Sequence, residues 1–265
     1  MPDLSTEDGI FALDRNVAVP SVHAAGPWDP RAQHGSAPAS LIAYVVSQIP
    51  SAAPMQLARL TLDLMRPVPI APLTIDTQMV RDGKKIQVVT VTLLADGTPC
   101  VRASALRIRA ADTLLPDVTK GPPLGLPMPE ASTPSVGRPM HPGFVDNLDR
   151  RIARGGGPMT AEGPSSVWFR LNRPIVTGVP ILPVMRAAVA ADFPNGISSV
   201  LPFQDWMFIN GDLSFNLARE PVGEWVLCEA TTTYGPNGCA IAHAALADAH
   251  GWIGRSVQSL VVEKR

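Results

Sequence analysis

The order of apolar and polar positions along the chain is the same in its two halves. Apolar side chains recur at helical spacing in residues 36–49, where Ser36 suits a helix cap and Pro50 ends the pattern. Apolar and polar positions then alternate as in β-strands, and the hairpin sequences Asp82-Gly83 and Asp96-Gly97 separate the segments. The predicted strands are residues 57–65, 73–81, 86–94 and 100–109. The first half is therefore predicted to be a helix followed by an antiparallel meander.

The second half repeats this order. A predicted strand at residues 167–171 precedes a predicted helix at residues 183–193. The strands predicted after this helix are residues 212–218, 225–233, 239–247 and 252–262. Residues 59–109 align with residues 212–263 with only short gaps, so the two halves look like diverged copies of one unit.

A stretch rich in proline separates the two copies. Residues 111–164 have little periodicity, and we expect a crossing linker with one short helix near residues 144–153. The predicted domains are an N-terminal unit, a linker and a C-terminal unit, at residues 1–112, 113–163 and 164–265. A helix followed by a long antiparallel meander is an α+β arrangement, in which two helices pack against a continuous antiparallel sheet.

Composition excludes several classes of function. The 265 residues are 46% hydrophobic, enough to fill a core, and the net charge of -1 gives no basic excess for nucleic acid. No run approaches the roughly 20 apolar residues of a membrane helix. The three cysteines form no CxxC pair, so we expect no metal site and no cofactor. The N-terminus is acidic, whereas a secretory signal peptide begins with a basic segment, so we expect the protein in the reducing cytoplasm.

Three polar residues of the second half are candidates for chemistry that occurs once per chain. Each alone has a plain structural explanation: a turn after Asn-Gly, strand propensity, and a solvent-facing strand position. Their joint order and spacing favours a shared role. The alignment pairs them with unlike residues of the first half: Asp212 with Arg59, Thr233 with Arg81, and Gln258 with Ser104.

These residues carry a resemblance to a known family. A helix followed by a meander, present twice, is similar to the double-hotdog acyl-CoA thioesterases, and specifically resembles the acyl-CoA thioesterase II family. The resemblance implies an acyl-CoA substrate, and it implies that Asp212, Thr233 and Gln258 hold and activate the water that attacks the thioester. The residue after the family's Asp is commonly His, whereas this chain has Leu213.

The residue types fit that chemistry independently. Hydrolysis needs an oriented, partly deprotonated water, which Asp212 supplies as base while Thr233 and Gln258 hold it. Negative charge that develops on the carbonyl oxygen needs donors, and free N–H groups at a helix start provide them. The candidate donors are Gly35 and Ser36, where glycine lets the thioester approach the backbone.

Two alternative functions remain open, and so does the oligomeric state. Asp29 and His34 have the Asp-x4-His spacing of the hotdog enoyl-CoA hydratases, although Arg31 and Ala32 replace the Asn and Pro of that motif. The other interpretation of His34 is a loop residue before the helix. The second alternative is an inactive acyl-CoA-binding protein. A homo-oligomer is expected from the edges and faces that a long sheet leaves.

Overall fold

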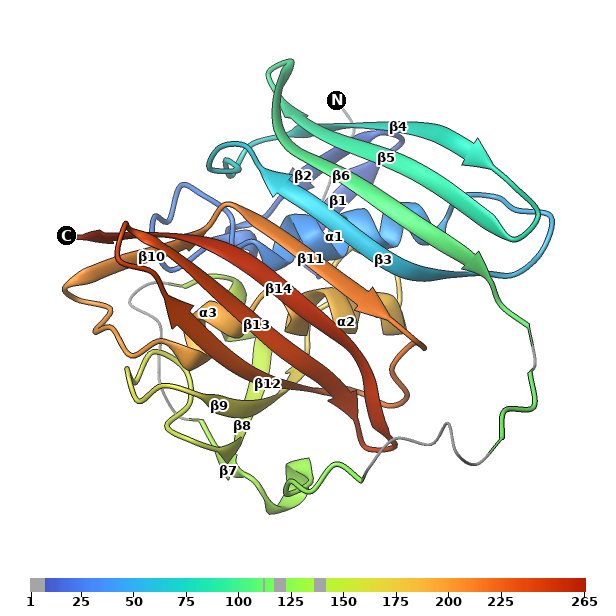
Figure 1. Ribbon diagram of the computed structural model, residues 1–265. Helices are drawn as coiled ribbons and strands as arrows, with labels where there is room; N and C mark the ends of the chain where they lie inside the picture. The colour runs from blue at the N-terminus through green and yellow to red at the C-terminus, as the bar shows by residue number, and fades with distance from the viewer. Residues whose placement is uncertain (1–7, 112, 117–122, 136–141) are drawn as a thin grey trace.

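The strands form one continuous antiparallel sheet (Figure 1). The computed structural model describes residues 8–111, 113–116, 123–135 and 142–265. The helix and strands of the first half are β1 (Phe11–Asp14), β2 (Val17–Pro20), α1 (Ser36–Ser47), β3 (Met55–Leu64), β4 (Leu73–Asp82), β5 (Ile86–Ala95) and β6 (Thr98–Arg109). Those of the second half are β7 (Thr133–Pro134), β8 (Leu148–Arg154), β9 (Ser165–Leu171), α2 (Pro183–Ala191), α3 (Pro194–Ser198), β10 (Trp206–Asn210), β11 (Asp212–Leu217), β12 (Trp225–Tyr234), β13 (Cys239–Asp248) and β14 (Gly251–Lys264).

The predicted order of a helix and then four antiparallel strands is confirmed in both halves, but only the last three strands of each half form a meander, because β3 pairs with β6 and β11 pairs with β14. The sheet runs in the order β1-β2-β4-β5-β6-β3-β11-β14-β13-β12-β9-β8-β7, with β10 added beside β14. At the predicted hairpin between β5 and β6, Asp96 and Gly97 both have positive φ, 47° and 72°. Two positive φ angles give the tight turn whose twist suits a hairpin.

The two halves join at β3 and β11. Thr61 and Ser214 lie opposite each other there, and their hydroxyl oxygens are 2.8 Å apart. These two residues are 153 positions apart in the sequence, the same offset that aligns Arg59 with Asp212. Equivalent residues that face each other mark a pseudo-twofold axis through the sheet, as expected for two copies of one unit.

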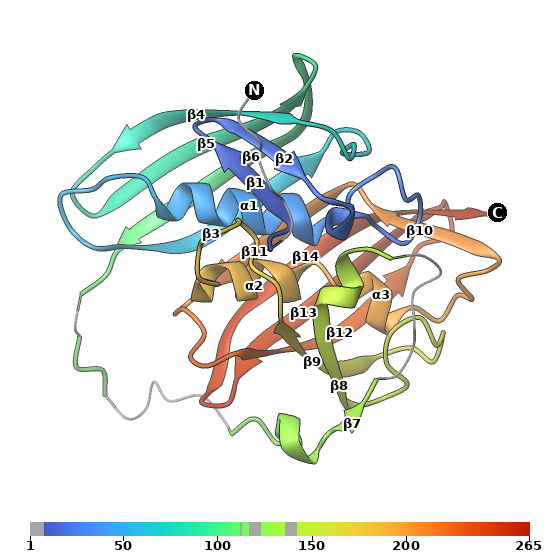
Figure 2. The same ribbon diagram turned by 180° about the vertical axis from the view of Figure 1, so that it is seen from behind.

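Both long helices lie on the same face of the sheet, side by side (Figure 2). Helix α1 is apolar on most of its surface, and its Leu41 and Ile42 are fully buried. Its alanines Ala37, Ala39 and Ala43 are buried too, and their small size lets the sheet and α2 approach closely. None of the helices within the described residues is long and apolar enough to cross a membrane.

The expected linker needs correction. Residues 144–147 form a 3-10 turn, but residues 148–154 form β8, which pairs with β9 instead of continuing a helix. Phe144 is fully buried in the main core. Pairing with β9 satisfies the backbone groups of this extended segment. The domain boundaries at 112 and 163 stay a prediction.

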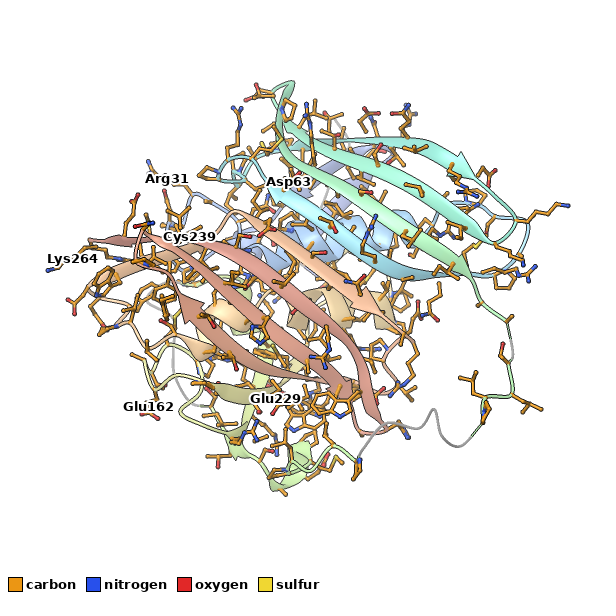
Figure 3. All side chains as sticks on the ribbon, viewed as in Figure 1. Arg31, Asp63, Glu162, Glu229, Cys239 and Lys264 are labelled. Carbon is orange, nitrogen blue, oxygen red and sulfur yellow. The ribbon has the colours of Figure 1, made fainter. Side chains whose placement is uncertain are left out.

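The other face of the sheet carries the side chains that point away from the helices. Asp63 and Cys239, labelled in Figure 3, are exposed on this face. Along β11, Leu213 and Phe215 are fully buried against the helices. Successive side chains of a strand point to opposite faces, so Asp212 belongs to the outer face with Asp63, its partner across the strands.

Candidate active site

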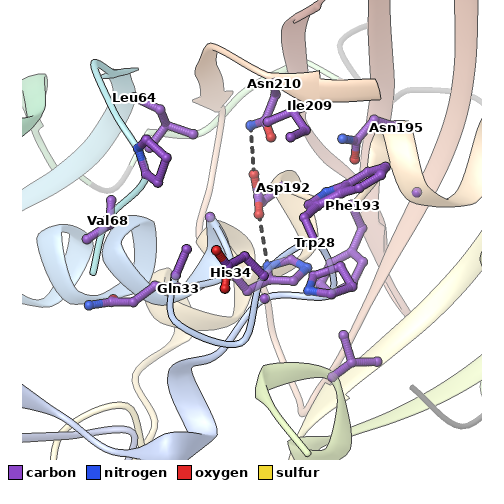
Figure 4. Close-up of a pocket in the computed structure, with 18 of the residues that line it drawn as sticks. Trp28, Gln33, His34, Leu64, Val68, Asp192, Phe193, Asn195, Ile209 and Asn210 are labelled. Carbon is purple, nitrogen blue, oxygen red and sulfur yellow. Dashed lines mark hydrogen bonds and ion pairs between the residues drawn. The ribbon is translucent and has the colours of Figure 1, made fainter. Parts of the chain in front are cut away.

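One cavity of about 560 Å³ lies where the two halves meet at the helix side of the sheet (Figure 4). The first half supplies the loop before α1 and the segment after β3, and the second half supplies α3, β10 and the end of α2. Most of its wall is apolar, including Trp28, Phe193 and Phe203. A large, mostly apolar cavity with a few polar groups is the usual form of a small-molecule site.

The carboxylate of Asp192 is the polar centre of this cavity. Asp192 follows the last residue of α2, lines the cavity, and is only 4% exposed. Its Oδ1 accepts hydrogen bonds from Gln258 Nε2 at 3.0 Å and Asn210 Nδ2 at 3.1 Å. Its Oδ2 lies 3.1 Å from Ser36 Oγ and 3.2 Å from His34 Nδ1. A buried carboxylate with partners on both oxygens is held in one orientation.

Gly35 lets the N-terminus of α1 approach this carboxylate. A Cβ atom built on Gly35 would lie 2.7 Å and 2.8 Å from the two carboxylate oxygens of Asp192, closer than real Cβ atoms come. Any side chain at position 35 would therefore displace Asp192. The contact also brings a carboxylate to the helix end where the dipole is positive, which is electrostatically favourable.

Gln258 holds Asp192 from the sheet. It is fully buried on β14, and its Nε2 donates to both the carboxylate and the backbone carbonyl of Asp192. Its Oε1 accepts the N–H of Asn195 at 3.2 Å. Gln258 does not border the cavity itself among the residues that the structure describes. It therefore fixes the carboxylate instead of touching a ligand.

Asn210 stands at the cavity wall where β10 gives way to β11. Its Nδ2 donates to Asp192 Oδ1 and, at 3.1 Å, to the backbone carbonyl of Asp212. The side chain is thereby fixed at both the site and the backbone of the next strand. Asn210, Asp192 and Asn195 line the cavity at this end, and Asn210 and Asp192 are hydrogen-bonded to each other (Figure 4).

The structure brings Gln258 to the cavity's carboxylate but leaves Asp212 and Thr233 on the other face of the sheet. Ser259, one residue after Gln258, donates its N–H to Asp212. Thr233 is exposed and stands opposite Ile241, which in turn stands opposite Ser259. Residues directly opposite share a face, so this row is the outer one, while Gln258 points inward. This corrects the expectation that the three side chains share one site.

The two predicted oxyanion residues lie at the start of α1. Gly35 borders the cavity, and its N–H donates to none of the described residues. Ser36 is fully buried; its N–H donates to His34 Nδ1 at 3.1 Å. Gly35 thus presents the open backbone donor, whereas the donor of Ser36 is already engaged.

The Asp-x4-His pair of the alternative interpretation does not form. Asp29 lies beside Arg31, whose Nε and terminal nitrogen donate to its carboxylate at 3.0 Å and 2.8 Å. His34 contacts Asp192 instead, from the other half of the chain. Among the described residues no three His, Cys, Asp or Glu side chains gather as a metal site.

Asp192 and Asn210 are the residues that sequence reasoning missed. Asp192 follows a run of alanine and valine in α2, and one carboxylate after an apolar helix looks like an ordinary helix end. Asn210 precedes a glycine and looks like a turn. The available signal was the burial expected for α2, because a carboxylate at the end of a buried helix needs partners.

Two arginines, Arg150 and Arg66, border the cavity. Burial lowers the pKa of the Arg150 guanidinium, and the nearby charge of Asp146 raises that pKa in part. Arg66 is exposed. The cavity therefore has a half-buried and an exposed positive charge beside its apolar surface.

Comparison with known proteins gives the family. An acyl-CoA thioesterase N-terminal domain model matches residues 24–108, and an acyl-CoA thioesterase C-terminal domain model matches residues 121–262. The second match begins well before residue 164, in agreement with the pairing of β8 and β9. A comparison with curated protein sequences gave no match.

Several solved structures share the fold over nearly their whole length. A hot dog fold protein from Alicyclobacillus acidocaldarius is 15% identical, with a TM-score of 0.77 and 97% of each chain covered. A putative thioesterase II from Thermobifida fusca is 15% identical, with a TM-score of 0.72 and 99% of each chain covered. An acyl-CoA thioesterase II from Mycobacterium marinum is 18% identical, with a TM-score of 0.63 and 96% of this chain and 95% of that chain covered. With the two domain models spanning most of the sequence, the chain belongs to the acyl-CoA thioesterase family of thioester hydrolases and has the hotdog fold in two copies.

Proposed function

We propose that the chain hydrolyses an acyl-CoA thioester to the free acid and coenzyme A, with Asp192 as the base that activates water. The observation that carries the proposal is the buried Asp192 carboxylate at the cavity, oriented by Gln258 and Asn210 and adjacent to the N-terminus of α1. Thioester hydrolysis needs a base, a held water and a donor for the carbonyl oxygen. All three are available within this group of residues.

The attacking water is held between Asp192 and Asn210, because these two polar side chains border the cavity together. Within the described residues Asn210 Oδ1 accepts no hydrogen bond, so it is available to that water. The water gives its proton to Asp192 as its oxygen bonds to the thioester carbonyl carbon. Gln258 keeps the carboxylate in place from behind.

The open N–H of Gly35 is the donor for the carbonyl oxygen. It lies at the positive end of a 12-residue helix, and Gly35 borders the cavity next to Asp192. Negative charge that develops on the oxygen is stabilised there by the hydrogen bond and by the dipole. The carbon–sulfur bond then breaks, and coenzyme A leaves as the thiolate.

Asp192→Asn tests this assignment, and Asp212→Asn is its matched control. Asparagine keeps the shape of the side chain and accepts from Gln258 and Asn210, so the variant should fold. Asp192→Asn should lower kcat by about 10²- to 10⁴-fold, the usual cost of losing a general base. Asp212→Asn changes a carboxylate on the outer face and should leave kcat unchanged.

The measurement is release of coenzyme A from a panel of acyl-CoAs, followed with a thiol reagent. The exposed Cys239 reacts with the reagent once per chain, so an enzyme blank is needed. Loss of turnover in Asp212→Asn with an active Asp192→Asn would reverse the assignment. Binding of acyl-CoA by the wild type without any turnover would favour the inactive binding protein instead.

A further inference from the structure

The side chain of His34 is held next to Asp192 by its packing neighbours. Its ring lies between two phenylalanines, with ring centroids 5.2 Å from Phe144 and 4.9 Å from Phe193. Its side chain is 11% exposed, and the residue borders the cavity. The imidazole comes from the first half of the chain and the carboxylate from the second. The packing therefore holds Nδ1 at 3.2 Å from Asp192 Oδ2.

The hydrogen-bond network assigns the resting tautomer of His34. The backbone N–H of Ser36 donates to Nδ1 at 3.1 Å, so Nδ1 acts as an acceptor and carries no proton. The proton of the neutral ring is then on Nε2. Asp192 Oδ2 lies 3.2 Å from the same nitrogen, so a proton between these two atoms would relieve their repulsion and would displace the N–H of Ser36 from the single lone pair of Nδ1.

From this arrangement we propose that His34 is a positioning residue that accepts, through Nδ1, the proton that Asp192 takes from water. The proposal rests on the proposed function and adds to it a proton acceptor outside the water-holding group. It also explains why Asp192 divides its partners: Gln258 and Asn210 hold Oδ1, while Ser36 and His34 meet Oδ2.

The proton balance is complete. The O–H bond of water breaks as oxygen bonds to the carbonyl carbon, and the proton moves to Asp192 and then to Nδ1. The imidazolium and the regenerated carboxylate form an ion pair while the tetrahedral intermediate exists. When the carbon–sulfur bond breaks, the proton on Nδ1 returns to Asp192 and passes from Asp192 to the thiolate, so the neutral ring again carries its only proton on Nε2.

Two substitutions separate proton acceptance from packing. His34→Phe keeps a ring between Phe144 and Phe193 but has no nitrogen. His34→Asn keeps an acceptor for the N–H of Ser36 but cannot accept a proton. Both should lower kcat by roughly 10²-fold, with KM nearly unchanged, since proton transfer by a side chain typically contributes that much. His243→Phe, on the outer face of β13, is the matched control and should leave kcat unchanged.

Chemical rescue gives a readout that a structural role would not move. His34→Ala leaves a slot between two aromatic rings, and added imidazole should restore kcat in a saturable way. Activity of His34→Asn within about threefold of the wild type, or absence of rescue in a folded His34→Ala, would overturn the proposal.

A measurement without substrate distinguishes this proposal from the proposed function. Two-bond ¹H–¹⁵N NMR spectra report which ring nitrogen of each histidine is protonated, and the His34 signals are those missing from His34→Phe. We expect Nε2 protonated and Nδ1 unprotonated in the neutral ring. A proton on Nδ1 would refute the relay even if the wild type hydrolyses acyl-CoA. If the wild type hydrolyses no acyl-CoA, the proposed function fails, while the NMR result still decides whether Nδ1 is available to accept a proton.

Discussion

The substitution Gly35→Ala tests whether the packing of the two halves sets the position of the base. The added methyl carbon would lie 2.7 Å from one carboxylate oxygen of Asp192 and 2.8 Å from the other. Ordinary contact begins at 3.4 Å, so the carboxylate has to move by about 0.7 Å, or α1 has to move away from α2. Neither group yields easily, because Gln258 and Asn210 hold the carboxylate and α1 is almost wholly buried.

The expected magnitudes follow from what that movement breaks. Overpacking in a rigid interior costs about 1–3 kcal/mol, and weakening hydrogen bonds to a charged group adds about 1–2 kcal/mol. We therefore expect the free energy of unfolding to fall by roughly 2–5 kcal/mol and Tm to fall by roughly 5–15 °C. A misplacement of about 1 Å near reacting atoms costs about 10²-fold in rate, so kcat should fall by that order.

The assay pairs thermal unfolding with acyl-CoA turnover, and Gly196→Ala is the comparison. A Cβ on Gly196 would meet only the end of Met159, at 3.7 Å, which is ordinary contact. This methyl group is added to the same cavity wall but without a clash. If Gly35→Ala and Gly196→Ala both retain the kcat and Tm of the wild type, contact with α1 does not fix the position of Asp192, and the reasoning fails.

Element order was predictable because it depends on local patterns. The strand segments from residue 57 to 109 and from residue 212 to 262 agree with the observed β3–β6 and β11–β14, and both helices are confirmed. Strands β8 and β10 were not predicted. Their pairing partners, β9 and the end of β14, determine that these short segments are extended, and a sequence pattern does not contain that information.

The site was harder to predict because it depends on which face of the sheet a residue occupies. Gln258 and Ser259 are neighbours in sequence and lie on opposite faces, so a shift of one residue separates a buried amide from an exposed serine. Asp212 and Thr233 have suitable chemistry but lie on the outer row with Ser259. Asp192 reaches the cavity only because α1 and α2 pack with Gly35 between them, which depends on contacts across the whole chain.

Two further substitutions test the support of the site and of the fold. Gln258→Leu removes the donor to Asp192 and the acceptor for the N–H of Asn195, so kcat should fall by about 10-fold or more and the free energy of unfolding by about 1–3 kcal/mol, measured by turnover and urea unfolding. Wild-type levels of both would show that Gln258 does not orient the base. Asp248→Asn tests a second buried carboxylate, which accepts from Arg219 at 2.7 Å and from the N–H of Val222 at 2.8 Å. Burial raises the pKa of Asp248, but the hydrogen bond from Arg219 and those from the backbone outweigh burial, and its folded-state pKa is lowered. A lowered pKa means that the carboxylate stabilises the fold fully above the ordinary aspartate range and loses this contribution as the pH falls through the folded-state value. Asp248→Asn should therefore cost about 2–3 kcal/mol at pH 7, and its unfolding free energy should fall less steeply with acid than that of the wild type. Equal acid sensitivity of the two proteins in urea unfolding would show that this pair contributes nothing to the pH dependence.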